Sequence, residues 1–478
     1  MTRLNRVPRH WHHYRLFTGN AGAFEWGRVG NTFRVPQGID QVGIACFGRG
    51  GRCNIPQSPH GKALGGGGGG AFAYGVLAVY PGTLLTHFGV LDSYTYFHNF
   101  LMAGAGEESV EHLGGRGGIA TALDSQGLLQ DIRLENGGNG GNGQINNIIN
   151  HYSHGGGGAS GSFYGRGGDG GQGYTISQAE AWRWPLGCFF GHGGGGGWGG
   201  QGGSSLVGID APVPGQPFFG SQSGGGGGGL QDGGGVMIPQ GLTDVSAYQS
   251  ATVPGGGGGA WGPGEDGSGP VVNQRYRPGR GGPGLSHAAD GIDDPDDGGR
   301  FVMRQSDVKD TGMPDCSTIA IYNGMNGDGH TPVNPFLAMA TRDLDGSGGS
   351  GAQYFHAGHG GPGGGGGGAG FIDVKVGPAE DDFAGLGNAG HGGFGGGGGG
   401  GVGQFVPKKS KPADNRVPFA IAGQGGFGGG GGGGGVFSLD EDGAKHIIEG
   451  AGQGGPAGGA GGGPGSDGGG VGCIIIYW

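Results

Sequence analysis

The sequence is poor in the residues from which an ordinary protein core and surface are built. Hydrophobic residues make up only 33% of its 478 residues and charged residues only 13%, against about 45–50% and 25% in globular domains. Length alone would allow roughly two to four domains, but the apolar side chains are too few to fill that many cores. Either much of the chain is disordered, or its interior is built from backbone.

Cysteine is scarce, and its spacing excludes two common kinds of stabilising site. The five cysteines are odd in number and contain no Cys-x-x-Cys pair, so neither a zinc ribbon nor a disulfide framework is expected. Free thiols of this kind pack as small apolar side chains. We expect free thiols at Cys46, Cys53, Cys188, Cys316 and Cys473.

Long apolar runs and an excess of positive charge are also missing. No stretch approaches the roughly 18 consecutive apolar residues that span a bilayer, so we expect no membrane insertion. The net charge is −11, which disfavours nucleic acid as a partner, because a nucleic-acid binder presents a basic face. Residues 1–17 are basic but lack an apolar core, so no secretory signal is expected.

Glycine is the residue that the sequence has in excess. There are 140 glycines and only 26 prolines, with no Gly-X-Y period, and this excludes collagen, which needs glycine at every third position and abundant imino acid. Seven runs contain five or more consecutive glycines, and they begin at Gly65, Gly193, Gly224, Gly255, Gly363, Gly395 and Gly428.

These runs have two interpretations, a flexible tether or an ordered array. Flexible tethers mix glycine with serine, but serine hardly interrupts the runs in this chain. Aromatic residues also recur just after the runs, which favours order. Five of the seven runs are followed within three residues by an aromatic side chain, namely Phe72, Trp198, Trp261, Phe371 and Phe437.

The ordered form predicted for such runs is the polyglycine II helix. This helix is extended, with three residues per turn, a rise of about 3.1 Å and no internal hydrogen bonds. Each N–H and C=O therefore points outward and, when buried, must bond to a neighbouring helix. Only glycine allows the axes to approach closely enough, as at the axis of collagen. We predict a bundle of such helices, held by mutual hydrogen bonds and by a collar of aromatic residues or a sheet.

Strands are predicted near both ends of the chain. Residues 31–48 indicate two short strands around a Pro-Gln-Gly turn, and residues 71–90 indicate a strand, a Pro-Gly turn and a second strand. The apolar terminus 473–478 is expected to pair with these N-terminal strands, since frayed termini are seldom so apolar. Helical patterns are limited to 176–184 and 334–342.

The predicted fold is therefore mainly β and irregular. A β-sheet base formed by the N-terminal strands and the C-terminal strand carries a bundle of polyglycine II helices with long displayed loops. Residues 1–30 are expected to be an attachment segment, and residues 31–154 a β-rich base domain with the first glycine run. Residues 155–478 are expected to form the bundle, with 260–362 as its longest inserted loop.

Several short motifs lie beside the glycine runs. They are Phe-x-Val-Pro-x-Gly-Ile at 33–39, Tyr-Pro-Gly-Thr at 80–83, Gly-Ala-Ser-x-Ser-Phe at 158–163 and Ile-Ile-Ile-Tyr-Trp at 474–478. Their order, with glycine runs between them, resembles the glycine-rich domain of tail-fibre and receptor-binding proteins of tailed bacteriophages. The departures are Tyr164, where the family has glycine, and long insertions at 91–152 and 260–362, which shorter family members lack.

The resemblance covers about residues 31–478 and implies a virion structural protein of the phage tail. It implies a tail-fibre or tail-tip component that mediates host-surface recognition and attachment. Its partners would be other phage tail proteins and a host cell-surface receptor, either protein or polysaccharide. Fibre proteins are usually homotrimers, but a polyglycine bundle can be complete in one chain, so the oligomeric state stays open.

Loops between rigid elements tolerate insertion, so the inserted segments are the expected sites of host contact. Aromatic side chains are enriched among the residues that carry binding energy, although each could instead anchor its loop on the scaffold. The candidates for receptor contact are Tyr94, Tyr96, Phe97, Phe100, Trp182, Trp184, Tyr276 and Tyr354.

Metal sites are weakly indicated. An acidic stretch around residues 290–297 offers hard oxygen ligands for Ca²⁺, but it also fits a solvated loop. A second fragment at 343–347 resembles part of a calcium loop, yet Tyr354 occupies the place of the bidentate glutamate. The candidate ligands are Asp293, Asp294, Asp296, Asp343 and Asp345. No other cofactor is expected.

Catalysis is not expected. With this much glycine, a Gly-x-Gly-x-x-Gly pattern arises by chance and carries no information on nucleotide binding. A phage polysaccharide depolymerase would need two carboxylates about 5–10 Å apart in a sugar groove, and neither a marked pair nor β-helix repeats are present. The alternatives to receptor binding are therefore a purely structural virion protein and, less favoured, a depolymerase. A bacterial or plant cell-wall protein is disfavoured by the missing signal segment.

Overall fold

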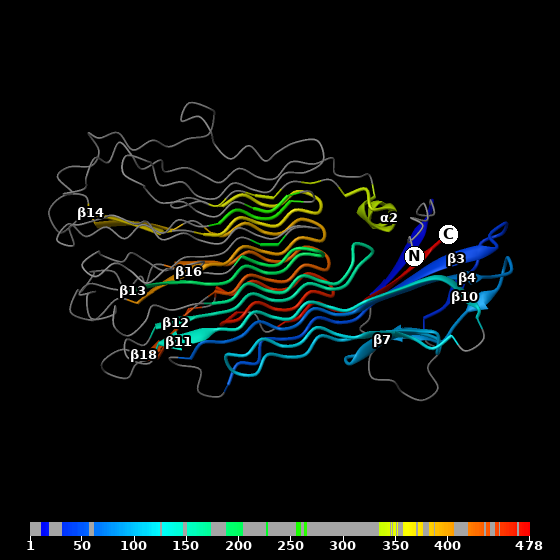
Figure 1. The fold of residues 1–478 in the computed structure, drawn as a ribbon, viewed down its shortest axis with the longest axis horizontal. Coiled ribbons are helices and arrows are strands. Elements are labelled where there is room, and N and C mark those ends of the chain that lie inside the picture. Colours follow the sequence, from blue (N-terminus) through cyan, green and yellow to red (C-terminus); the bar gives the residue numbers. More distant parts are fainter. Residues whose placement is uncertain are drawn as a thin grey trace, which may run out of the picture.

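The computed structural model has three parts in a row (Figure 1). A β-sheet lies at one end, β-hairpins and one small three-stranded sheet lie at the other (the hairpin end), and glycine-rich segments run side by side between them. The residues that the structure describes are 11–18, 31–56, 62–124, 127–146, 151–173, 188–203, 226–227, 255–259, 262–264, 334–344, 346, 348–349, 351, 357–369, 371–375, 382–386, 388–405, 419–434, 436–439, 445–448, 450–465 and 468–478.

The sheet has five antiparallel strands in the order β1-β20-β3-β4-β10. The C-terminal strand lies between two N-terminal strands, with Ile475 opposite both Leu16 and Ala45. All of its residues are buried, as its apolar, β-branched sequence favours. The prediction that the terminus pairs with the N-terminal strands is confirmed. The strands are β1 (Tyr14–Thr18), β20 (Cys473–Tyr477), β3 (Gln41–Phe47), β4 (Phe72–Ala78) and β10 (Leu129–Glu135).

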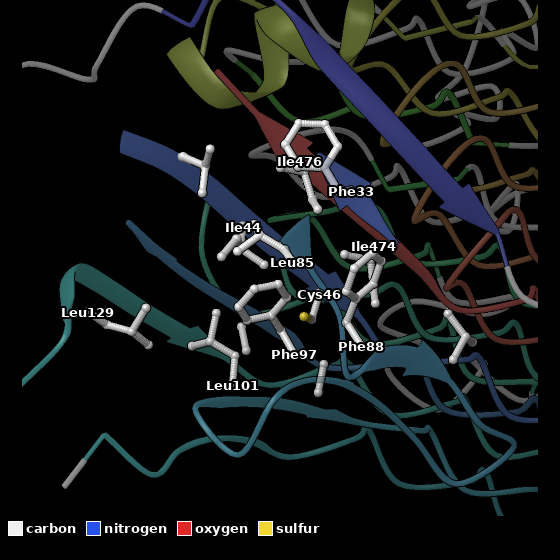
Figure 2. Close-up of a cluster of buried hydrophobic side chains, with 14 of the residues drawn as sticks. Phe33, Ile44, Cys46, Leu85, Phe88, Phe97, Leu101, Leu129, Ile474 and Ile476 are labelled. Atoms are coloured by element: carbon white, nitrogen blue, oxygen red, sulfur yellow. The ribbon is translucent and has the colours of Figure 1, made fainter. Parts of the chain in front are cut away.

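A smaller four-stranded sheet packs against one face of the large sheet (Figure 2). Phe88, Phe97 and Leu101 of the small sheet point toward Ile44 and Ile474 of the large one, and all five are buried. This apolar cluster is an ordinary side-chain core. The small sheet consists of β6 (Phe88–Val90), β7 (Tyr94–Phe97), β8 (Leu101–Gly104) and β9 (Ala120–Ala122).

The predicted N-terminal strands are present, but the two strands on either side of each turn do not pair with each other. β2 (Phe33–Arg34) pairs with β5 (Leu84–Leu85), and β3 pairs with β4. Gly38 and Gly82 have φ values of 83° and 82° in the two turns, a conformation that glycine adopts without steric cost.

One short helix covers the opposite face of the large sheet. Helix α2 (Pro335–Thr341) lies within the range 334–342 predicted to be helical. Asn334 caps it, because its Oδ1 accepts from the N–H of Phe336 at 3.2 Å, and Pro335 occupies the first helical position, where its missing N–H has no cost. The hydroxyl of Tyr477 donates to the carbonyl oxygen of Phe336 at 3.3 Å and so ties the helix to β20.

At the other end of the molecule, pairs of strands extend the glycine-rich segments (Figure 1). Each pair is antiparallel, and most of these strands directly precede or follow a glycine segment. They are β11 (Gln144–Asn146) with β12 (His151–Ser153), β13 (Cys188–Gly191) with β16 (Val402–Phe405) and β17 (Phe419–Ala420), β14 (Phe371–Lys375) with β15 (Asp382–Leu386), and β18 (Val436–Leu439) with β19 (Lys445–Ile448).

The described part of the chain is mainly β-sheet and irregular with very little helix, as predicted. Within it, no helix has the length and apolar character needed to cross a membrane.

Candidate functional site: a hydrogen-bonded glycine array

The glycine run 65–70 lies at the centre of a network of backbone hydrogen bonds. Its N–H groups donate to three neighbouring segments in turn, with donor–acceptor distances of 2.8 to 3.0 Å. Each neighbour is therefore reached by every third residue, which is the period of a three-residue turn. Gly65 and Gly68 donate to the segment 104–111, Gly66 and Gly69 to 138–141, and Gly67 and Gly70 to 457–460.

The carbonyl oxygens of the same run bond to three further segments. Gly51 donates to Gly68 at 2.7 Å, segment 115–118 donates to Gly66 and Gly69, and segment 155–161 donates to Leu64, Gly67 and Gly70. The run is thus enclosed by six neighbours. Because almost no other group is available to satisfy its backbone, these bonds are what allows the run to be buried.

A later run, 428–434, is enclosed in the same way. Its donors reach 456–462, 423–426 and 193–196, and its acceptors are reached from 157–160, 398–401 and 452–455. We use the name glycine array for all segments joined by such bonds. They are 48–53, 64–71, 104–118, 137–143, 154–161, 167–173, 192–203, 226–227, 255–259, 262–264, 348–349, 357–369, 388–401, 421–434 and 450–464.

The array extends across the divisions predicted from the sequence. Gly158 donates to Gly67 at 2.9 Å across the expected boundary at residue 154. Residues 14–18, within the expected attachment segment, form β1 of the large sheet. Six of the seven predicted runs begin at described residues of the array, and the start of the seventh, Gly224, lies outside the described residues.

Glycine is required in the array because its segments approach backbone to backbone. A Cβ atom built on Gly66 would overlap the carbonyl oxygen of Gly156, and one on Gly430 would overlap that of Gly157. The atoms that it would meet belong to the backbone of hydrogen-bonded neighbours, so they cannot rotate away as a side chain would. The array therefore has an interior made of peptide groups.

Four array segments form an internal repeat that the sequence analysis missed. Residues 357–368, 389–400, 422–433 and 451–462 all read Ala-Gly-(His/Gln)-Gly-Gly-(Phe/Pro), followed by glycine with a few alanines. The spacing of their first residues is 389 − 357 = 32, 422 − 389 = 33 and 451 − 422 = 29. A search for self-similarity at this period would have found it.

Each repeat reverses direction at a tight turn beside the sheet end. The turns place a residue with positive φ after the Phe or Pro: 89° at Gly363, 87° at Gly395, 79° at Gly428 and 68° at Ala457. This is the pattern of a type II turn. Successive repeats are then bonded turn to turn, since Gly395 donates to the carbonyl of Phe427 at 2.9 Å.

Aromatic side chains fill the space where the array meets the sheet. Trp198 is completely buried and its ring centroid lies 5.3 Å from Phe394 in an edge-to-face arrangement. Its indole Nε1 donates to the Oγ of Ser160 at 3.1 Å. We call this cluster the aromatic junction, and it consists of Phe47, Phe163, Tyr164, Trp198, Phe336, Phe394 and Phe427.

Polar side chains complete the bonding along one edge of the array. The Oδ1 atoms of Asn139 and Asn142 accept from the N–H groups of Gly117 and Gly114 at 3.0 and 2.8 Å. The two asparagines lie three positions apart, and both accept from the same neighbouring segment, 114–117. Side chains thus complete the backbone hydrogen bonding at this exposed edge.

Two stacked histidine pairs also accept backbone N–H groups. The Nδ1 of His192 accepts from the N–H of His154 at 2.9 Å, and their rings lie 4.9 Å apart with an interplanar angle of 18°. The Nδ1 of His359 accepts from the N–H of His391 at 2.9 Å, and their rings are also 4.9 Å apart, at 4°. The first pair is fully buried, and the second lies at the exposed rim.

The predicted receptor contacts on β7 lie at the sheet end, opposite the hairpins. Tyr94 and Tyr96 are half-buried with ring centroids 5.8 Å apart, and burial together with Tyr94 raises the pKa of Tyr96. Phe97 is fully buried, so the expectation that it contacts a receptor is wrong, and Phe100 packs against the same core. Trp182, Trp184, Tyr276 and Tyr354 lie outside the described residues.

The predicted metal ligands are not brought together in the described part of the chain. Asp343 is exposed just after α2, and no group of three or more His, Cys, Asp or Glu side chains suited to a metal occurs among the described residues. Asp293, Asp294, Asp296 and Asp345 lie outside them. Cys46, Cys53 and Cys473 form no disulfide and are buried, as expected.

Comparison of the chain with protein-family models, with curated proteins and with solved structures gives no match. The glycine array, which joins a sheet at one end to paired strands at the other, is the main feature of the described residues.

Proposed function

We propose that the chain is a structural and host-attachment protein of a bacteriophage tail, a tail-fibre or tail-tip component. One observation carries the proposal: hydrogen-bonded glycine segments connect the sheet end to the hairpin end (Figure 1). Such an array makes a stiff spacer, because every segment is tied to its neighbours along its length. The phage assignment itself is supported by the order of the sequence motifs at 33–39, 80–83, 158–163 and 474–478 between the glycine runs.

We further propose that the array segments are polyglycine II helices. The rotation of donors among three neighbours, the outward direction of all backbone groups and the exclusion of Cβ atoms support this geometry. At a rise of about 3.1 Å per residue, the run 428–435 would reach roughly 25 Å, a length typical of a small domain. An array that is stiff over that length would hold the sheet end and the hairpin end apart.

The proposed orientation places the sheet toward the tail and the hairpins toward the host. β1 and β20 bring both described ends of the chain to the sheet end, which suits joining it to other tail proteins. In this orientation the half-buried Tyr94 and Tyr96 of β7 face a neighbouring tail protein rather than a receptor. Host contact, with a protein or a polysaccharide, is then assigned to the segments that continue from the hairpins.

Adsorption competition tests the attachment role. Purified protein added to host cells should block adsorption of the phage that carries it, because it occupies the receptor. Absence of inhibition at saturating protein would favour the alternative of a purely structural virion protein. Electron microscopy of virions labelled with an antibody against this chain would then locate it on the tail. Labelling elsewhere would contradict both the attachment role and the purely structural role in the tail.

The depolymerase alternative is tested separately. Incubation of the protein with the host surface polysaccharide should release no reducing ends above those of a heat-denatured sample. Release by native protein would assign an enzymatic role.

A further inference from the structure

The buried histidine pair lies at a particular position in the fold. His154 directly follows β12 and His192 directly follows β13, so the pair marks the point where the glycine array passes into the paired strands of the hairpin end. It links three segments in series, because Leu64 donates to the Nδ1 of His154 at 3.0 Å and His154 donates to the Nδ1 of His192 at 2.9 Å.

The two hydrogen bonds require neutral imidazole rings. An Nδ1 that accepts a backbone N–H carries no proton, so the single proton of the neutral ring is on Nε2. In the imidazolium form both nitrogens are donors, and the Nδ1 proton of His192 would face the N–H of His154. Protonation thus replaces a hydrogen bond by two opposed donors inside an array that has no room to rearrange.

We infer that the pair His154–His192 is an acid-sensitive lock that holds the glycine array together at the hairpin end. The inference goes beyond the proposed function, since it concerns the stability of the array whatever the hairpins contact. The exposed pair His359–His391 has the same geometry. The backbone N–H of Gln424 donates in turn to the Nδ1 of His391 at 2.9 Å. The arrangement therefore occurs twice in this fold.

The electrostatics of the pair agree with this geometry. Burial lowers the pKa of His192 well below its usual 6.5, and the neighbouring His154 lowers it further. Among the described residues, His154 is the one titratable group whose charge acts on His192. The adjoining segments 399–401, 431–434 and 461–463 contribute glycine alone. The charged residue closest to Leu64 in sequence is Lys62, whose Nζ lies 4.0 Å from Oε1 of Glu111.

The direction of the pH effect follows from linkage. The folded state keeps His192 neutral, whereas the unfolded chain binds a proton below pH 6.5, so the unfolded state binds more protons in that range. The stabilising contribution is fully present above pH 6.5 and is lost as the pH falls from there toward the folded pKa. Each histidine held neutral lowers the ratio of folded to unfolded protein about tenfold per pH unit below 6.5.

Asparagine is the replacement for histidine that keeps the acceptor, because asparagine side chains already accept backbone N–H groups elsewhere in the array. The Oδ1 of Asn142 accepts a backbone N–H at 2.8 Å and does not titrate. The test compares the wild-type chain with H154N, H192N and the double variant, and with H112N as a control at an exposed histidine. Hydrogen exchange of residues 62–66 and 192–197, corrected for intrinsic rates, is measured between pH 8 and pH 5.

The wild-type chain and H112N should lose protection steeply below pH 6.5, whereas the double variant should lose much less. Parallel pH profiles for the wild-type chain and the double variant would overturn the inference. If the double variant does not fold at pH 8, NMR titration of the histidine ring protons in the wild-type chain decides the question. Both buried rings should stay neutral down to the pH at which the array opens, and ordinary titration of either ring near pH 6.5 would refute the lock.

Discussion

We use the name base for the large sheet and the small sheet packed against it. The base and the glycine array have interiors of opposite kinds. In the base, apolar side chains such as Ile44, Phe88 and Ile474 fill the space between two sheets (Figure 2). In the array, the space is filled by peptide groups, and a side chain at Gly66 or Gly430 would have no place. The base is therefore sensitive to loss of volume, and the array is sensitive to gain of volume.

The aromatic junction is where the two kinds of interior meet, and its loss should have the largest effect. Trp198→Ala leaves a cavity among Tyr164, Phe394 and Phe427 and should lower the free energy of unfolding by about 3 to 5 kcal/mol. Phe88→Ala, a cavity inside the base, should cost a similar amount. Denaturant unfolding measures both.

Hydrogen exchange separates these two variants. Trp198→Ala should raise exchange in the array segments 395–401 and 428–434, whereas Phe88→Ala should raise it in β6 and β7 only. Identical exchange maps for the two variants would mean that the base and the array are not distinct interiors.

The second prediction adds a single methyl group to the array. Gly430→Ala should lower the free energy of unfolding by about 1 to 3 kcal/mol, the usual cost of overpacking, because the new Cβ would overlap the carbonyl of Gly157. Gly468→Ala is the matched control, since nothing lies within 4 Å of its built Cβ, and it should be near neutral. Equal melting temperatures for the two variants would contradict a backbone-filled interior.

A third, smaller effect is expected at the rim, where a side chain replaces a neighbouring segment. Asn142→Ala removes the acceptor for the N–H of Gly114 and should cost about 0.5 to 1.5 kcal/mol, the net value of one hydrogen bond. Asn142→Asp keeps an acceptor and should recover most of the loss. Thermal unfolding of both variants checks this, and an equal loss in both would show that the acceptor is not what matters.

The smallest expected effect is chemical rather than energetic. Burial raises the pKa of the Cys46 and Cys473 thiols far above its usual range, so at pH 8 neither forms the reactive thiolate. Peptide mass spectrometry after treatment with iodoacetamide should find both unmodified in native protein and modified after denaturation. Alkylation of either in the native chain would mean that the centre of the large sheet opens readily.

The sequence predicts the base better than the array because the base is encoded by side-chain patterns. The apolar terminus, the strands within 31–48 and 71–90, and the helix capped by Asn334 follow from such patterns and are confirmed. Alternation along β7 could also have identified Phe97 as buried, since Thr95 and Phe97 face inward while Tyr94 and Tyr96 face outward.

The sequence does not predict which glycine segments bond to each other in the array, because glycine has no side chain to specify the partner or the register. Any run could pair with any other until its flanking residues are placed. The repeat beginning at Ala357 and the buried positions of His154 and His192 carry that information. The histidines could not be distinguished from ordinary turn residues by type, since their role depends on Leu64 and on each other, across 90 and 38 positions of sequence.

Hydrogen–deuterium exchange of the glycine runs in the intact protein tests the backbone-filled interior most directly. Amides in 65–70 and 428–434 should exchange as slowly as those in β3 and β20, because each donates to a neighbouring segment at 2.7 to 3.0 Å. Exchange at the rate of an unstructured glycine chain in these runs, with β3 and β20 still protected, would show that the runs do not bond to one another.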